Sequence, residues 1–385
     1  MHLREIFTNA AQAESASLCS YNGRWVASRV CGGVVLPVIL MACMLSPPNA
    51  TAEEAAWPPI EIAGHSVAPG ETARFFVDLA GTMAGQSRML DAFVVVTRGV
   101  RSGPTLCLTA GIHGDEVNGM EVAHRIYAGT SGSALAGTLI AVPAVNMQGV
   151  RSGSRYLPDR RDLNRAFPGN PDGSLASRVA HSLYQGVIRQ CDALIDLHTG
   201  SSSRTNLPQI RTDLEFPPAL RLARSFGVGV VLHGLGPSGS LRRAVLEAGV
   251  PAVIYEAGEP LRFEEEEIRR GVEGVRNVMA ELGMIQQTVE TQPSEVYRKT
   301  SWVRAGDAIG VFLTARKPGD YVKKGDVLGT VSDPVSEEVA TIVAPRDGRI
   351  IGMAVPQFVL PGYGLFHLGL DPELNGAAGK ASPDG

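Results

Sequence analysis

A chain of 385 residues with 44% hydrophobic content is long enough to bury a full core and to form more than one domain. Its 35 basic and 39 acidic residues give a formal net charge of −4. The absence of a basic excess argues against nucleic acid as a partner and favours a small molecule or a short peptide.

The first 52 residues are predicted to be an export signal. Arg24 and Arg29 precede an apolar run at residues 30–45, and the small-x-small pattern Ala50-Thr51-Ala52 follows it. The run is too short, and too rich in glycine and proline, for a comfortable membrane span. Cleavage after Ala52 would release an exported protein, periplasmic or secreted, with no membrane-spanning segment.

The cysteines allow a second interpretation of this segment. The stretch LMAC at residues 40–43 resembles a lipoprotein signal, in which Cys43 is acylated and remains as a lipid anchor. Beyond the signal only Cys107 and Cys191 remain, which is too few for a disulfide scaffold. Both are expected to be buried small hydrophobic residues.

Residues 53–290 are predicted to form an α/β domain, because apolar runs and helix-like stretches alternate along them. We expect a mostly parallel or mixed sheet flanked by helices, with its ligand site outside the carboxyl ends of the strands. The expected strands are 91–99, 104–111, 137–146, 192–200, 227–234 and 251–258, and the expected helices are 115–129, 173–190, 240–250 and 262–283.

Residues 291–373 are predicted to form a small all-β domain. Short apolar runs alternate there with turn sequences such as PGD and KKGD. Residues 374–385 are expected to be a disordered tail.

Two histidines and a glutamate stand at predicted strand ends. His113 and Glu116 lie in the stretch TAGIHGDEVNG, where a strand ends and a helix begins, and His198 follows another apolar run. Two histidines and one carboxylate form the ligand set of a catalytic zinc with a fourth position for water. His233 also ends a strand and is the rival ligand; the remaining histidines lie in less suitable positions.

A metal-activated water needs a nearby base, and acyl transfer needs cationic groups for the developing oxyanion. Glu256 follows an apolar strand, where a carboxylate is either buried at a cost or used. The Gly/Pro-rich loop at residues 151–169 carries five arginines, a density expected for carboxylate binding: Arg151, Arg155, Arg160, Arg161 and Arg165.

Four motifs in this order, GIHGDE, SRYLPDRRDLNRAFPG, DLHTG and YEAGE, resemble the succinylglutamate desuccinylase and aspartoacylase family. These enzymes are deacylase relatives of the zinc carboxypeptidases, and the resemblance covers about residues 85 to 370. It implies a zinc-carboxypeptidase-like fold. It also implies that His113, Glu116 and His198 hold one Zn²⁺ per chain, and that Glu256 takes a proton from the attacking water and passes it to the leaving amine.

The resemblance assigns further roles within the arginine loop. Asp162 would orient the His113 ring, and Asn164 and Arg165 would bind a substrate carboxylate. Arg155 would stabilise the oxyanion, but the run PDRR lengthens the loop and leaves Arg160 as an alternative for that role. Outside the loop, Arg211 would be a further carboxylate partner.

The C-terminal sequence resembles half of a lipoyl or biotinyl carrier domain. The connecting stretch VSEEVATI has no lysine to modify, so a lid or oligomerisation role, and hence a homo-oligomer, is expected in place of cofactor carriage.

The leading hypothesis is a zinc-dependent deacylase that cleaves an amide bond of an N-acyl amino acid or a similar small carboxylate-bearing amide. Export keeps an alternative open, a zinc carboxypeptidase or murein-peptide amidase with the same site. A third interpretation is a non-catalytic binding protein, which would be supported by a substituted ligand position, and none of the matched positions is substituted.

Overall fold

The computed structural model describes residues 57–79, 90–289 and 293–375. The predicted export signal, its cleavage site and the lipoprotein alternative at Cys43 lie outside the described residues. Within the described ranges, every helix is too short or too polar to cross a membrane.

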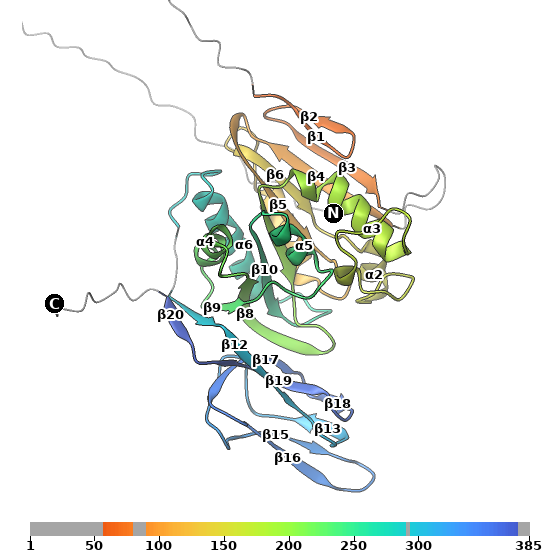
Figure 1. The fold of residues 1–385 in the computed structure, drawn as a ribbon, viewed down its shortest axis with the longest axis vertical. Coiled ribbons are helices and arrows are strands. Elements are labelled where there is room, and N and C mark those ends of the chain that lie inside the picture. Colours follow the sequence, from red (N-terminus) through yellow and green to blue (C-terminus); the bar gives the residue numbers. More distant parts are fainter. Residues whose placement is uncertain (1–56, 80–89, 290–292, 376–385) are drawn as a thin grey trace, which may run out of the picture. The chain divides into compact units, whose positions relative to one another are not determined.

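A mixed sheet forms the centre of the fold (Figure 1). Four central strands run parallel in the order β6, β5, β7 and β10. At one side β4 runs antiparallel to β6 and β3 antiparallel to β4, and at the other side β8 runs antiparallel to β10. The bounds are β3 (Thr72–Asp78), β4 (Asp91–Arg98), β5 (Arg101–Ala110), β6 (Ala136–Val142), β7 (Ala193–His198), β8 (Arg204–Thr212), β9 (Val230–His233) and β10 (Ala252–Gly258); a separate hairpin pairs β1 (Ile60–Ile62) with β2 (His65–Val67).

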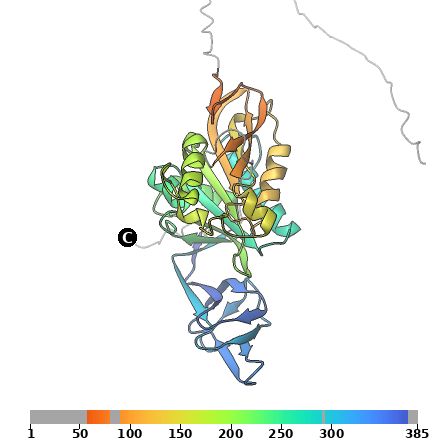
Figure 2. The same ribbon diagram turned by 90° about the vertical axis from the view of Figure 1, so that its right-hand side faces the viewer.

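Helices cover both faces of this sheet, as Figures 1 and 2 show. One core cluster lies under α1, α4 and α6, and a second lies under α3 and α5. The six helices of the described residues are α1 (Asn118–Ala128), α2 (Met147–Ser152), α3 (Leu175–Gly186), α4 (Pro217–Phe226), α5 (Leu241–Glu247) and α6 (Glu265–Glu281). The predicted fold class, an α/β mixed sheet flanked by helices, is therefore confirmed.

The pairing of Cys107 with Cys191 corrects a prediction. Both cysteines are buried, as expected, but they form a disulfide across 84 residues of chain, with Cα atoms 5.7 Å apart. Sequence could not show this, because the two residues meet only when β5 lies beside β7. The bond ties β5 to the segment just before β7, and the far ends of these two strands lead to His113 and His198.

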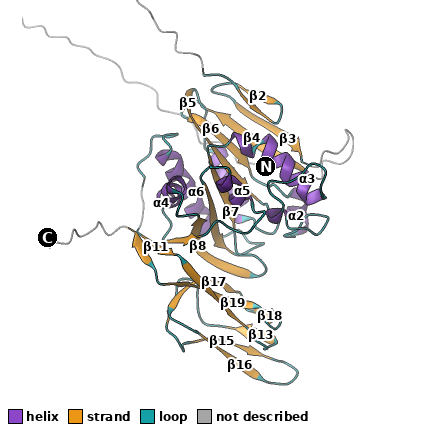
Figure 3. Ribbon diagram, in the orientation of Figure 1, coloured by secondary structure: helices purple, strands orange, loops and turns teal. Residues whose placement is uncertain are grey.

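The C-terminal region consists of strands and loops within residues 293–375 (Figure 3). β17 pairs with β8, so β17, β19 and β12 continue the main sheet. A separate core is formed by these strands together with a four-stranded antiparallel sheet of β16, β15, β13 and β18. The bounds are β11 (Ser294–Tyr297), β12 (Lys299–Arg304), β13 (Gly310–Leu313), β14 (Tyr321–Val322), β15 (Val327–Ser332), β16 (Val339–Val343), β17 (Gly348–Ala354), β18 (Gln357–Val359), β19 (Gly364–Leu370) and β20 (Glu373–Asn375), which pairs with β11 and extends into the stretch assigned to the tail.

Candidate metal centre and active site

Three ligand candidates meet at the carboxyl ends of β5 and β7. His113 and Glu116 lie in the turn between β5 and α1, and His198 is the last residue of β7. The start of α1 approaches β7 closely because Gly119 has no side chain: a Cβ there would lie 2.6 Å from Cβ of Leu197. All three ligand candidates are buried, and their exposed fractions do not exceed 4%.

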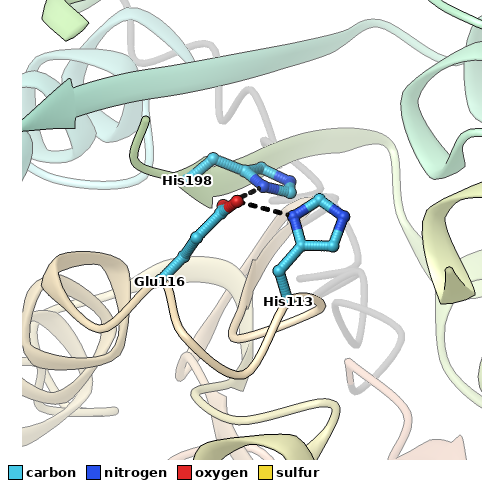
Figure 4. Close-up of side chains that lie close together, drawn as sticks. All are labelled: His113, Glu116 and His198. Atoms are coloured by element: carbon cyan, nitrogen blue, oxygen red, sulfur yellow. Dashed lines mark hydrogen bonds and ion pairs between the residues drawn. The ribbon is translucent and has the colours of Figure 1, made fainter. Parts of the chain in front are cut away.

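The side chains are arranged around the carboxylate of Glu116 (Figure 4). Its Oε1 lies 2.8 Å from Nδ1 of His113, and its Oε2 lies 2.6 Å from Nδ1 of His198. The opposite ring nitrogens each meet an aspartate. Nε2 of His113 is 3.3 Å from Asp162 Oδ1, and Nε2 of His198 is 2.8 Å from Asp196 Oδ2.

This arrangement fits a divalent metal ion. The candidate ligand atoms of His113, Glu116 and His198 lie within 4.8 Å of one another. Metal-binding histidines typically use one ring nitrogen for the ion and the other for a carboxylate, which fixes the orientation of the ring. Two nitrogen donors and one carboxylate match a catalytic zinc site with one open position.

The electrostatics of the three groups are coupled. Burial raises the pKa of Glu116, but both histidines lower it more, and the net pKa lies well below its usual range. Burial lowers the pKa of His198, but Asp196 and Glu116 raise it, and the net pKa lies well above its ordinary value. The pKa of His113 is raised in the same way by Glu116 and Asp162. The carboxylate is therefore ionised and suited to a cation.

Arg155 lies against the metal group, whereas Arg160 does not. Nη1 of Arg155 is 3.3 Å from Glu116 Oε1, and Nη2 donates to Asp162 Oδ2 at 2.8 Å. Burial lowers the pKa of Arg155, but Glu116 and Asp162 raise it by more. The net pKa lies above its ordinary value, so the guanidinium stays charged. Arg160 is exposed and has a left-handed backbone with φ of 62°. Of the two candidates for the oxyanion role, Arg155 is the one at the centre.

Glu256 lies directly beside His198, because the parallel register of β10 and β7 pairs these two residues. Its side chain is 13% exposed. Oε2 accepts a hydrogen bond from Asn206 Nδ2 at 2.6 Å, and Oε1 lies 3.1 Å from Arg211 Nη1. Two side chains of β8 thus hold both carboxylate oxygens next to the metal group.

Asn164 and Arg165, which were predicted to bind a substrate carboxylate, contact other parts of the protein. Asn164 is buried, and its Oδ1 accepts a hydrogen bond from the backbone N–H of Leu241 at 2.8 Å. Arg165 is exposed, and its Nη1 donates to the carbonyl of Asn164. The rival ligand His233 does not join the metal group: its Nδ1 accepts from the backbone N–H of Leu214 at 3.1 Å.

Four residues near the centre were missed from the sequence. Asp196 could have been found, because it precedes His198 by two positions and the alternation of a strand puts both on one face. Asn206 and Arg242 come from elements whose position depends on tertiary packing, and His367 comes from the C-terminal strands. No sequence signal marked these three.

Comparison with known proteins finds similarity to deacylases. A model of the succinylglutamate desuccinylase/aspartoacylase catalytic domain matches residues 102–282. This range contains the metal group together with Arg155 and Glu256. The N-alpha-acetyl-L-2,4-diaminobutyric acid deacetylase of Halomonas elongata is 28% identical over 279 residues, which are 69% of this chain and 81% of that protein.

Two solved structures share the fold at 26% sequence identity. The succinylglutamate desuccinylase/aspartoacylase of Rhodobacter sphaeroides has a TM-score of 0.70, covering 77% of this chain and 94% of the other. The product-bound ectoine utilization protein EutE (DoeB) of Ruegeria pomeroyi has a TM-score of 0.71, covering 78% of this chain and 95% of the other.

Proposed function

Because a model of the succinylglutamate desuccinylase/aspartoacylase catalytic domain matches residues 102–282, we propose that this chain is a member of that family and a zinc-dependent hydrolase of an N-acyl amino acid or a similar small carboxylate-bearing amide. The observation that carries the proposal is the buried group of His113, Glu116 and His198 with Glu256 on the adjacent strand. The group supplies zinc ligands, and the neighbouring carboxylate supplies a base.

Zn²⁺ held by these three residues would polarise the amide carbonyl and make water a stronger nucleophile near neutral pH. Glu256 accepts the proton of the attacking water and returns it to the leaving nitrogen. Asn206 and Arg211 orient its carboxylate for both transfers. Arg155 stabilises the negative charge that develops on the carbonyl oxygen, and its bond to Asp162 fixes the guanidinium in place.

The test is the Glu256→Gln variant, which keeps the size of the side chain but removes the base. We expect the rate of amide hydrolysis to fall about 10²- to 10⁴-fold, because that is the usual contribution of a general acid–base residue. Bound zinc, measured by mass spectrometry of the metal, should stay at the wild-type level. The matched control is Glu247→Gln, since Glu247 forms only a surface ion pair with Arg243. A near-normal rate in Glu256→Gln would refute this role.

We also propose that the protein is exported, to the periplasm or beyond. The support is the buried disulfide between Cys107 and Cys191, since disulfides persist in oxidising compartments, together with the export signal that the sequence of residues 1–52 predicts. Mass spectrometry of the mature N-terminus distinguishes cleavage after Ala52 from acylation of Cys43.

Export supports a second candidate function, a carboxypeptidase or murein-peptide amidase with the same site, because cell-wall peptides lie outside the inner membrane. Assays on N-acyl amino acids and on short peptides containing diaminopimelate separate the two. Faster turnover of the peptides would favour the second candidate.

A further inference from the structure

Unpaired hydrogen-bonding atoms gather around Arg211. Among the described residues, eight buried side-chain nitrogen and oxygen atoms have no hydrogen-bond partner. Four of the eight belong to Arg211, Arg242 and His367: Nε of Arg211, Nε and Nη1 of Arg242, and Nδ1 of His367. The charge of Arg211 acts on both of the other side chains. Buried polar groups are normally paired, so this concentration calls for a ligand.

Arg242 is a buried cation without a carboxylate of its own. It lies near the start of α5 and is 5% exposed. Burial, followed by repulsion from Arg211, lowers its pKa to about 10. The carboxylates that act on its pKa are engaged elsewhere: Glu256 with Arg211 and Asn206, Asp196 with His198, and Asp213 with the backbone N–H of Glu215. A buried charge without a partner is costly, and an anionic ligand would remove that cost.

The arginine loop holds α5, and with it Arg242, in place. Asn164 accepts the backbone N–H of Leu241, the residue before Arg242. The backbone N–H of Phe167 donates to the carbonyl of Gly239 at 2.9 Å. A Cβ on Gly239 would lie 2.3 Å from the carbonyl oxygen of Arg165, so the two segments are in direct backbone contact. Asn164 therefore fixes the start of α5 through its Oδ1, and its Nδ2 stays the atom that the prediction assigns to a substrate carboxylate.

His367 brings the C-terminal strands to the same place. Gly352 of β17 pairs with Asn206 of β8 on one side and with His367 of β19 on the other. Paired residues of neighbouring strands project to the same face, so His367 lies on the face that carries Asn206 and Glu256. Gly352 leaves room between them, because a Cβ there would lie 2.5 Å from Oδ1 of Asn206.

The His367 ring is fixed and neutral. It stacks on Trp302 with ring centroids 4.5 Å apart and an interplanar angle of 2°. Burial, followed by repulsion from Arg211, lowers its pKa to about 3. The side chain is 7% exposed, and its Nδ1 is unpaired. A neutral imidazole in a fixed orientation can donate one hydrogen bond without adding another charge to two arginines.

We propose that Arg242 and His367 complete, with Arg211, the pocket that binds the carboxylate of the substrate. This proposal rests on the proposed function, and it names the residues that make the substrate site specific for an anion. A carboxylate has about four acceptor sites, which suits several N–H donors from fixed positions. Arg165, predicted beside Arg211 and Asn164 as a carboxylate ligand, is exposed. Arg211 contacts Glu256 through Nη1 and has Nε free for the pocket, so it links substrate binding to the base.

The experiment measures binding to the zinc-loaded full chain by isothermal titration calorimetry. The probes are free L-amino acids beside their carboxamides, and succinate beside succinamide, which represent the two halves of an acyl amino acid and avoid turnover. We expect at least one acid to bind more tightly than its amide. Arg242→Gln should weaken that acid about 10- to 100-fold and leave the amide unchanged, since a hydrogen bond to a charged group contributes about 1.5–3 kcal/mol.

The matched control is Arg243→Gln on the same helix, because Arg243 forms a surface ion pair with Glu247. It should bind the acid as the wild type does. Arg242→Lys keeps the charge without the planar fork and should give an intermediate acid-to-amide ratio. If Arg242→Gln does not fold, as judged by its melting temperature, an unchanged ratio in Arg242→Lys overturns the proposal. An unchanged ratio in Arg242→Gln, or no preference for any acid in the wild type, does the same.

Hydrolysis of N-acyl amino acids, measured on the same preparations, separates this proposal from the proposed function. If the protein binds the acids through Arg242 but hydrolyses no N-acyl amino acid, the proposed function is refuted and the proposed pocket stands. If the protein hydrolyses N-acyl amino acids but its preference for acids does not depend on Arg242, the proposed pocket is refuted and the proposed function stands.

Discussion

Asp196 shows how a residue outside the metal group organises it. Its carboxylate is fully buried and accepts hydrogen bonds from two directions. Oδ1 is 2.7 Å from the hydroxyl of Thr109, and Oδ2 is 2.8 Å from Nε2 of His198. Asp162 has the same relation to His113. Each histidine therefore has its ring orientation set by an aspartate, and its Nδ1 faces Glu116.

The Asp196→Asn variant should weaken zinc binding about 10- to 100-fold, because mutation of such orienting partners typically has that effect. Competition with a fluorescent chelator measures the affinity. Asp192→Asn is the matched control at the exposed start of the same segment, where the carboxylate accepts only the backbone N–H of Thr105. Wild-type affinity in Asp196→Asn would show that the aspartate does not orient the ligand.

The sequence located the residues that directly follow apolar strands, since strand ends meet at one edge of a parallel sheet. His113, Glu116, His198 and Glu256 all belong to this class and are brought together. Arg242 could not be located in the same way. Its burial depends on how α5 packs on the arginine loop, and an arginine in a short amphipathic helix looks like a surface residue.

At the scale of elements, β8 was not predicted from the sequence, and neither were β1, β2 and β3. Pro208 interrupts the pattern of β8, and proline is uncommon within paired strands. Yet β8 carries Asn206 and Arg211 and connects β10 to β17. The residues that hold Glu256 thus come from an element that the sequence did not predict.

The disulfide joins β5 to the segment before β7, and the element-scale prediction concerns its loss. A Cys107→Ala/Cys191→Ala double variant should lose about 4 kcal/mol of unfolding free energy, because the cross-link closes an 84-residue separation in the unfolded chain. Urea denaturation measures the change. Reductant should destabilise the wild type and leave the double variant unaffected. Equal stability of the wild type with and without reductant would contradict the prediction.

At the scale of the whole molecule, the main sheet continues from the strands of the metal group into the C-terminal strands through β8 and β17. The sequence predicted an α/β region followed by an all-β region. It did not indicate that strand pairing between the two regions would place His367 on the same sheet face as Glu256. That juxtaposition depends on a long-range pairing between β8 and β17, and on the space at Gly352. We therefore propose that the C-terminal region, through His367, is part of the substrate site.

The central claim is that one zinc ion at His113, Glu116 and His198 supports amide hydrolysis. The most direct measurement removes metal from the purified protein, titrates Zn²⁺ back and follows the hydrolysis of a panel of N-acyl amino acids. We predict that activity is absent without metal, rises to a plateau at one zinc per chain, and is not restored in a His198→Ala variant. Full activity of the metal-free protein, or no hydrolysis of any N-acyl amino acid after reconstitution, would contradict the account.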